Sequence, residues 1–136
     1  MHAIAVDTNA YTAFKRGDAA ILSVLQHATD ILVSTIVLGE LLAGFAAGSR
    51  QGANRSELTQ FLDTSRVKVV SCGIVTADFY GLTFAALRRI GHPIPTNDLW
   101  IAASCLEHGA ALLTMDSHFA QVGGLRVGRQ LDDFVP

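Results

Sequence analysis

The sequence predicts an α/β fold with a central parallel sheet of four to five strands between two layers of helices. Short, mostly apolar runs at residues 3–6, 31–33, 67–70 and 111–114 alternate with stretches of helical periodicity. The runs do not alternate apolar with polar residues, which is typical of strands buried on both faces of a parallel sheet. The length of 136 residues fits one domain, so we expect a single domain over residues 1–136.

Capping residues place the helices of the first half. Asp18 and Ser34 or Thr35 stand where helices begin, since side chains of these types accept hydrogen bonds from free backbone N–H groups. In chain order we expect a turn into a helix at 7–9, a helix from Asp18 to about 27, a helix from Ser34 or Thr35 to about 47, a polar connection at 48–54 and a helix at about 57–64.

Glycine and proline mark the helix ends of the second half. A long helix at about 74–90 ends at Gly91 before Pro93, which is a common stop signal. Thr96 is the expected cap of the next helix. The remaining expected elements are a helix at 97–108 that stops at Gly109, a short helix at 117–121, a strand at 125–127 and an irregular tail at 131–136.

The composition limits the classes of partner. The net charge is −2, so the chain lacks the strongly basic balance of proteins that bind nucleic acid by charge alone. Half of the residues are hydrophobic and only 16% are charged, which favours self-association, and we expect a homodimer. No apolar run has the length of a membrane span and no signal peptide is evident, so we expect a cytoplasmic protein without a membrane partner.

Four acidic residues stand out by position. Asp7 directly follows the first predicted strand, and Asp116 follows the fourth by two residues. In parallel α/β sheets, sites form at the carboxyl ends of strands. Glu40 and Asp98 lie in helices whose other residues are nearly all apolar, so we expect these helices to be buried. Each acid alone has a structural explanation, such as a turn for Asp7 or Asp116 and a helix-dipole contact for Asp98.

Together the four acids indicate a shared cation. A buried carboxylate needs a cation, a set of hydrogen bonds or a proton, and no Lys or Arg lies near any of the four in sequence. Carboxylate oxygens are ligands for hard ions such as Mg²⁺ and Mn²⁺. Such an ion can activate a water and stabilise the charge that develops during phosphoryl transfer. The pattern therefore favours a metal-dependent hydrolase.

Three segments, taken in order, resemble the PIN-domain family, and most closely its VapC-type ribonuclease toxins of type II toxin–antitoxin pairs. The segments are "AVDTNAY", "VSTIVLGELLAG" and "IPTNDLWIAASCLEHGAALLTMDSHF", and the resemblance spans Ala5 to Phe119. It implies a PIN-like three-layer α/β/α fold. It also implies a Mg²⁺- or Mn²⁺-dependent endoribonuclease that hydrolyses phosphodiester bonds in RNA, commonly dimerises, and is held inactive by a small VapB-like antitoxin.

The resemblance also assigns roles to residues. It implies that Asp7, Asp98 and Asp116 hold the metal and that Glu40 completes the catalytic set of four acids. Thr8, Asn9 and Thr114 match small polar residues that support the metal ligands. Some relatives carry a fifth acid two residues after the fourth; here that position is His118, so the fifth acidic ligand is missing and occupancy by a second metal is in question. From sequence alone, His118 is expected at the surface or beside the metal ligands.

Other interpretations remain open at this point. Asp7 could form an aspartyl-phosphate, as in haloacid-dehalogenase-like phosphohydrolases, although Asn9 replaces the second Asp of their Asp-x-Asp motif. The protein could also be a non-catalytic regulator that binds RNA or an antitoxin. The arginines at 50 and 55, in an expected loop, and at 88 and 89 either contact RNA phosphates or are ordinary solvated charges.

Overall fold

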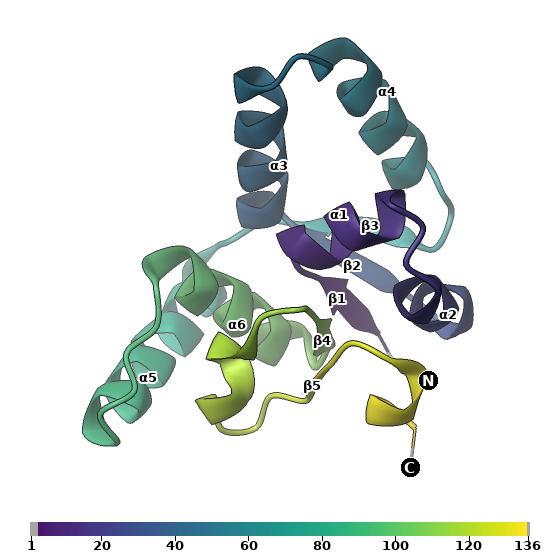
Figure 1. Cartoon of the computed structure of the whole chain (residues 1–136). Coiled ribbons are helices and arrows are strands. Elements are labelled where there is room, and N and C mark those ends of the chain that lie inside the picture. The colour runs from purple at the N-terminus through teal and green to yellow at the C-terminus, as the bar shows by residue number, and fades with distance from the viewer. Residues whose placement is uncertain (1–2, 136) are drawn as a thin grey trace.

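A computed structural model describes residues 3–135 and contains a five-stranded, fully parallel sheet (Figure 1). The strand order is β3-β2-β1-β4-β5. The strands are β1 (Ile4–Val6), β2 (Ile31–Ser34), β3 (Val67–Val70), β4 (Ala111–Leu113) and β5 (Val127–Gly128). The α/β class and the parallel sheet predicted from the sequence are therefore confirmed.

The described helices cover the sheet from two sides. They are α1 (Thr8–Lys15), α2 (Ala19–His27), α3 (Thr35–Ala47), α4 (Gln51–Leu62), α5 (Ile74–Arg89) and α6 (Thr96–His108), with short 3₁₀ helices η1 (Ser117–Gln121) and η2 (Leu131–Asp133). Figure 1 shows α5 and α6 on one side of the strands and α2 on the other, while α3 and α4 form a hairpin that projects from the body. The chain adds β2 and then β3 on one side of β1, and it crosses back over the sheet to add β4 on the other side. Because connections between parallel strands are right-handed, this change of direction places the later helices on the opposite face of the sheet.

Local sequence determines several helix ends. The Asp18 carboxylate accepts a hydrogen bond of 3.0 Å from Ile21 N, and the Ser34 hydroxyl accepts one of 3.2 Å from Val37 N. The Asp18 cap is as predicted, and of the two residues expected to start the next helix, Ser34 is the cap and Thr35 is the first helical residue. Gly109 ends α6 with φ = 62°, a left-handed conformation that glycine adopts without steric cost.

Other boundaries were predicted wrongly. Helix α4 begins at Gln51, so the polar segment 51–54 is helical and not a connection; three of its four residues are exposed, which a surface helix tolerates. Arg50 and Arg55 accordingly lie at the start of a helix and inside it, not in a loop. Thr96 is the first helical residue and Pro95 takes the cap position, where its fixed φ suits helix entry.

The helix that carries Glu40 is less buried than predicted. Within α3 only Val37 and Leu41 are fully buried.

Helix α5 exposes large apolar side chains, with Ile74 86% and Leu82 70% exposed. The described part of the chain contains no helix that is both long and apolar enough to cross a membrane.

Candidate active site

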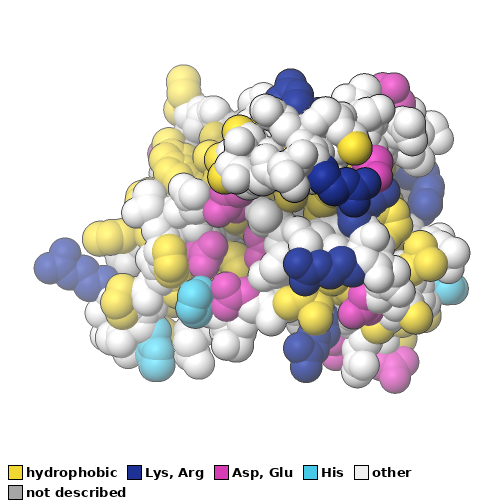
Figure 2. All heavy atoms as spheres, turned by 45° about the horizontal axis from the view of Figure 1, so that its top comes forward, with side chains coloured by type: hydrophobic (Ala, Val, Ile, Leu, Met, Phe, Trp, Pro, Cys, Tyr) yellow, Lys and Arg dark blue, Asp and Glu magenta, His cyan; other side chains and the backbone are white. Residues whose placement is uncertain are grey.

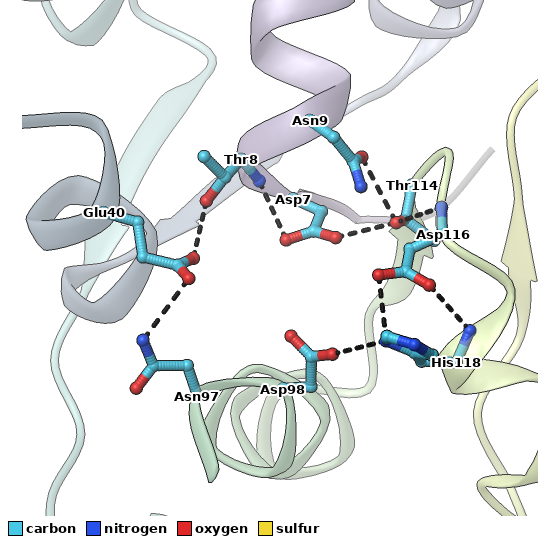
Figure 3. Close-up of polar contacts among 9 residues, drawn as sticks. All are labelled: Asp7, Thr8, Asn9, Glu40, Asn97, Asp98, Thr114, Asp116 and His118. Carbon is cyan, nitrogen blue, oxygen red and sulfur yellow. Dashed lines mark hydrogen bonds and ion pairs between the residues drawn. The ribbon is translucent and has the colours of Figure 1, made fainter. Parts of the chain in front are cut away.

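The strand order creates a crevice at the carboxyl ends of β1 and β4. These strands are hydrogen-bonded neighbours, and the connections on their two sides lead in opposite directions along the sheet. Ligand sites of open α/β sheets form at such a switch point. Asp7 follows β1 directly, while Thr114 and Asp116 follow β4, so these side chains meet at the crevice (Figure 3).

Asp7 is the most buried of the four acids, with only 4% of its surface exposed. Its Oδ1 accepts a hydrogen bond of 2.8 Å from Thr8 N, and its Oδ2 accepts one of 2.7 Å from the Thr114 hydroxyl. Burial raises the pKa of Asp7, and the charges of Asp98 and Glu40 raise it further, while the two hydrogen bonds oppose the change. The carboxylate is thus held firmly in place but is poorly compensated in charge.

Glu40 reaches the crevice from α3. Its Oε1 accepts a hydrogen bond of 2.7 Å from the Thr8 hydroxyl, and its Oε2 accepts one of 3.3 Å from the Asn97 amide of α6. Thr8 therefore connects two acids, because its backbone N–H contacts Asp7 and its hydroxyl contacts Glu40. These contacts orient the Glu40 side chain toward the other carboxylates across the opening seen in Figure 3.

Asp98, Asp116 and His118 form the opposite side of the crevice. The His118 Nδ1 atom lies 3.1 Å from Asp98 Oδ2 and 3.0 Å from Asp116 Oδ2. Burial raises the pKa of Asp98; the hydrogen bond from His118 opposes this, and the charge of Asp116 adds to it. Backbone contacts fix Asp116, whose N–H donates to the Thr114 hydroxyl at 3.0 Å and whose Oδ1 accepts from His118 N at 2.9 Å.

Asn9 joins the ends of the two central strands. Its Oδ1 accepts a hydrogen bond of 2.9 Å from Met115 N and lies 3.3 Å from the Thr114 hydroxyl. The side chains of Thr8, Asn9 and Thr114 therefore all bind an acid or the backbone that carries one. Residues in such positions fix the orientation of ligands around a metal.

An open hollow of about 840 Å³ lies over this cluster, and all four acids line it. Within residues 3–135, none of these carboxylates forms an ion pair with Lys or Arg. Figure 2 shows magenta carboxylates and a cyan imidazole near the middle of this face, with dark-blue basic side chains to one side. The donor set consists of hard oxygen atoms plus one imidazole nitrogen, which fits a divalent cation.

Sequence reasoning did not place Arg16 or Asn97 in this region. Arg16 lines the hollow, and with Thr12 it follows Thr8 at steps of four, so helical spacing could have placed it there. Asn97 contacts Glu40, and no sequence pattern indicated that contact. His118 was expected at the surface or beside the ligands, and the structure agrees: its side chain is 53% exposed and its ring lies between the carboxylates of Asp98 and Asp116.

Comparisons with known proteins agree with this architecture. The family model described as PIN domain matches residues 4–125. The chain is 30% identical over 95 residues to ribonuclease VapC4 of Mycobacterium tuberculosis, covering 70% of this chain and 73% of that protein. It is 31% identical over 106 residues to the plasmid stability protein StbB of Pseudomonas syringae pv. tomato, covering 75% and 76%.

Solved structures show the same fold. VapBC2 from Rickettsia felis, bound to a DNA fragment from its promoter, superposes with a TM-score of 0.81 at 26% identity, covering 93% of this chain and 97% of that one. DNA-bound VapBC from Salmonella typhimurium gives a TM-score of 0.82 at 24% identity, with 94% and 98% covered. With the family model matched over nearly the whole sequence, the chain belongs to the PIN-domain family.

Proposed function

We propose that this protein is a metal-dependent endoribonuclease and the toxin of a VapBC-type toxin–antitoxin pair. One observation carries the proposal: acids from four separate elements line one hollow at the switch point of the sheet and have no Lys or Arg partner within residues 3–135. The similarity to ribonuclease VapC4 and to VapBC complexes points in the same direction. We place its action in the cytoplasm, where RNA is available.

Asp7, Asp98 and Asp116 are the proposed metal ligands, and Mg²⁺ or Mn²⁺ is the proposed ion. The raised pKa values of Asp7 and Asp98, both caused first by burial, support this assignment, because a cation would offset the cost of keeping these buried groups ionised. When bound, a divalent cation activates water and neutralises charge on the phosphate that is cut. Glu40 is proposed to orient the attacking water and accept its proton, since Thr8 and Asn97 hold both of its oxygens.

Basic side chains next to the acids offer a path for the RNA strand. Arg16 borders the acidic hollow and also a second hollow of about 430 Å³ that Lys15 and Arg50 line. Lys15 pairs with Glu57 at 3.3 Å, whereas the described residues offer neither Arg16 nor Arg50 an acidic partner. Guanidinium groups bind phosphates well, so we propose that Arg16 and Arg50 hold RNA phosphates beside the cut.

The proposed protein partners are a VapB-like antitoxin and a second copy of this chain. VapBC2 of Rickettsia felis and VapBC of Salmonella typhimurium are complexes of this kind. Helix α5 exposes several large apolar side chains, which include Ile74, Val75 and Leu82. They support the homodimer, because small monomeric proteins rarely leave several large apolar side chains exposed to water.

Two alternatives fit the geometry less well. In an aspartyl-phosphate enzyme, the second residue of the Asp-x-Asp motif would have to be a free acid; here Asn9 is an amide engaged with Thr114 and Met115. A non-catalytic RNA- or antitoxin-binding regulator would have no need to keep four carboxylates in one hollow, since the charges around Asp7 and Asp98 repel them and oppose folding.

An RNA cleavage assay tests the proposal. Purified protein with Mn²⁺ or Mg²⁺ should cut a structured RNA internally and leave a 3′-hydroxyl and a 5′-phosphate, as attack by water requires. Excess chelator should stop the reaction. Products with a 2′,3′-cyclic phosphate, or full activity in chelator, would contradict the mechanism.

A further inference from the structure

We propose that His118 is itself a ligand of the divalent cation, so that its Nδ1 atom, Asp98 and Asp116 form a mixed nitrogen–oxygen metal site. The inference rests on the proposed function, because it requires a cation in the acidic hollow. His118 stands two residues after Asp116 and contacts both acids, although they come from different elements: Asp98 from α6 and Asp116 from the start of η1.

The spacing of the three side chains suits one ion. The Nδ1 atom lies 3.1 Å from Asp98 Oδ2 and 3.0 Å from Asp116 Oδ2, and a ligand atom from each of the three residues lies within 4.8 Å of the others. Adjacent ligands of an octahedral ion bound at about 2.1 Å lie about 3 Å apart. The His118 Nδ1 atom therefore already lies at this separation from a carboxylate oxygen of each acid.

The surrounding structure holds His118 toward the acids. Its backbone N–H donates to Asp116 Oδ1 at 2.9 Å, and the next residue, Phe119, is fully buried and anchors η1 in the core. The imidazole itself is 53% exposed, so ions and exchanging water can reach it. In Figure 3 the ring faces Asp98 and Asp116, on the far side of the opening from Glu40.

A nitrogen ligand has a consequence for metal choice. Imidazole binds first-row transition-metal ions in preference to Mg²⁺, whereas an all-oxygen site suits Mg²⁺. We therefore infer that His118 shifts the preference of this site from Mg²⁺ toward Mn²⁺ and related ions. If His118 only donated a hydrogen bond to the two carboxylates, its replacement would leave the type of ligand atom around the metal unchanged.

Pulsed electron paramagnetic resonance of the Mn²⁺-loaded full chain separates these cases without relying on activity. Wild type should show hyperfine coupling from a directly coordinated imidazole nitrogen, and His118→Gln should lose it while binding Mn²⁺ about tenfold more weakly. His108→Gln is the matched control, since His108 lies at the opposite end of α6 from Asp98 and contacts Ser104 O. It should keep the coupling.

His118→Asp provides the second measurement. It restores an oxygen ligand, so the ratio of Mn²⁺ to Mg²⁺ affinity, measured by Mg²⁺ competition against bound Mn²⁺, should fall by about tenfold relative to wild type. Bound Mn²⁺ without nitrogen coupling in wild type, coupling that persists in His118→Gln, or an unchanged ratio would overturn the role of His118 alone. Absence of Mn²⁺ binding to wild type would overturn both this inference and the proposed function.

Discussion

Helix α6 carries Asp98 and helix α3 carries Glu40. The sequences of both helices are apolar on nearly every side, yet α6 is much more buried than α3. The middle of α6 is covered so well that Leu99 and the residues 101–105 are all buried. In α3 only Val37 and Leu41 are buried, because the helix projects with α4 from the body of the protein. Many of its exposed positions hold Gly or Ala, which leave little apolar surface in water.

This comparison shows that an apolar pattern alone does not place a helix in the core, because α3 lies in a hairpin that projects from the body. It also divides the hollow into a core wall, with Asp7, Asp98 and Asp116, and an exposed wall formed by the less buried helix α3, which carries Glu40. We expect the first wall to hold the metal and the second to act on water and substrate. The predictions below test that division.

The largest effect is expected at the core wall. Asp98→Asn should reduce RNA cleavage by about 10³-fold, because it removes a metal ligand and the charge that the metal requires. Initial rates at saturating Mn²⁺ measure it. Asp63→Asn, at the exposed end of α4, is the control and should cleave like wild type. Cleavage by Asp98→Asn within a few-fold of wild type would remove Asp98 from the metal site.

A smaller effect is expected at the exposed wall. Glu40→Gln should reduce the rate about tenfold to a hundredfold, since the amide keeps an oxygen for the Thr8 hydroxyl but cannot accept a proton from water. Mn²⁺ affinity, measured by calorimetry, should change little. If Glu40→Gln abolished Mn²⁺ binding, Glu40 would belong with the metal ligands and the division between the two walls would be wrong.

The next effect concerns RNA binding. In an Asp98→Asn background that cannot cut, Arg16→Ala should weaken RNA binding several-fold and lower the slope of log affinity against log salt by about one. Fluorescence anisotropy at several salt concentrations measures both. Arg89→Ala, at the end of α5, should change neither. Equal losses in both variants would mean that binding reflects overall charge rather than a path beside the acids.

The smallest effect on the hollow is expected from a substitution on α5. Leu82 is 70% exposed, so Leu82→Glu costs little in the monomer but places a charge in the proposed dimer contact. Sedimentation velocity should show a dimer for wild type and a monomer for the variant. A wild type that stays monomeric at all concentrations would remove the support that composition gives to dimerisation.

The sequence predicted the parts of the molecule that local chemistry determines. The β1, β2, β3 and β4 runs and the caps Asp18 and Ser34 follow from hydrophobicity and hydrogen bonding within a few residues. The start of α4 at Gln51 was missed because polar residues form a surface helix as readily as a loop. That segment shows no apolar periodicity to reveal it.

The candidate site also contains parts that the sequence predicted and parts that it did not. Asp7 and Asp116 could be placed at one sheet edge because strand ends meet there, and the four acids do line one hollow. The contacts of His118 with Asp98 and of Asn97 with Glu40 join residues 20 and 57 positions apart. Such contacts depend on how the helices pack against each other, which no spacing in the sequence expresses.

Thermal unfolding of wild type and Asp98→Asn, with and without Mn²⁺, tests most directly whether the core wall holds the metal. The raised pKa of Asp98 means that the folded state binds its proton more tightly than the unfolded state, so ionisation above that pKa destabilises the metal-free fold. At neutral pH, metal-free Asp98→Asn should therefore melt no lower than wild type. Mn²⁺ at a hundredfold excess over Kd should stabilise wild type by about 2.7 kcal/mol, and the variant by clearly less. An equal Mn²⁺-induced shift in both proteins would contradict the account.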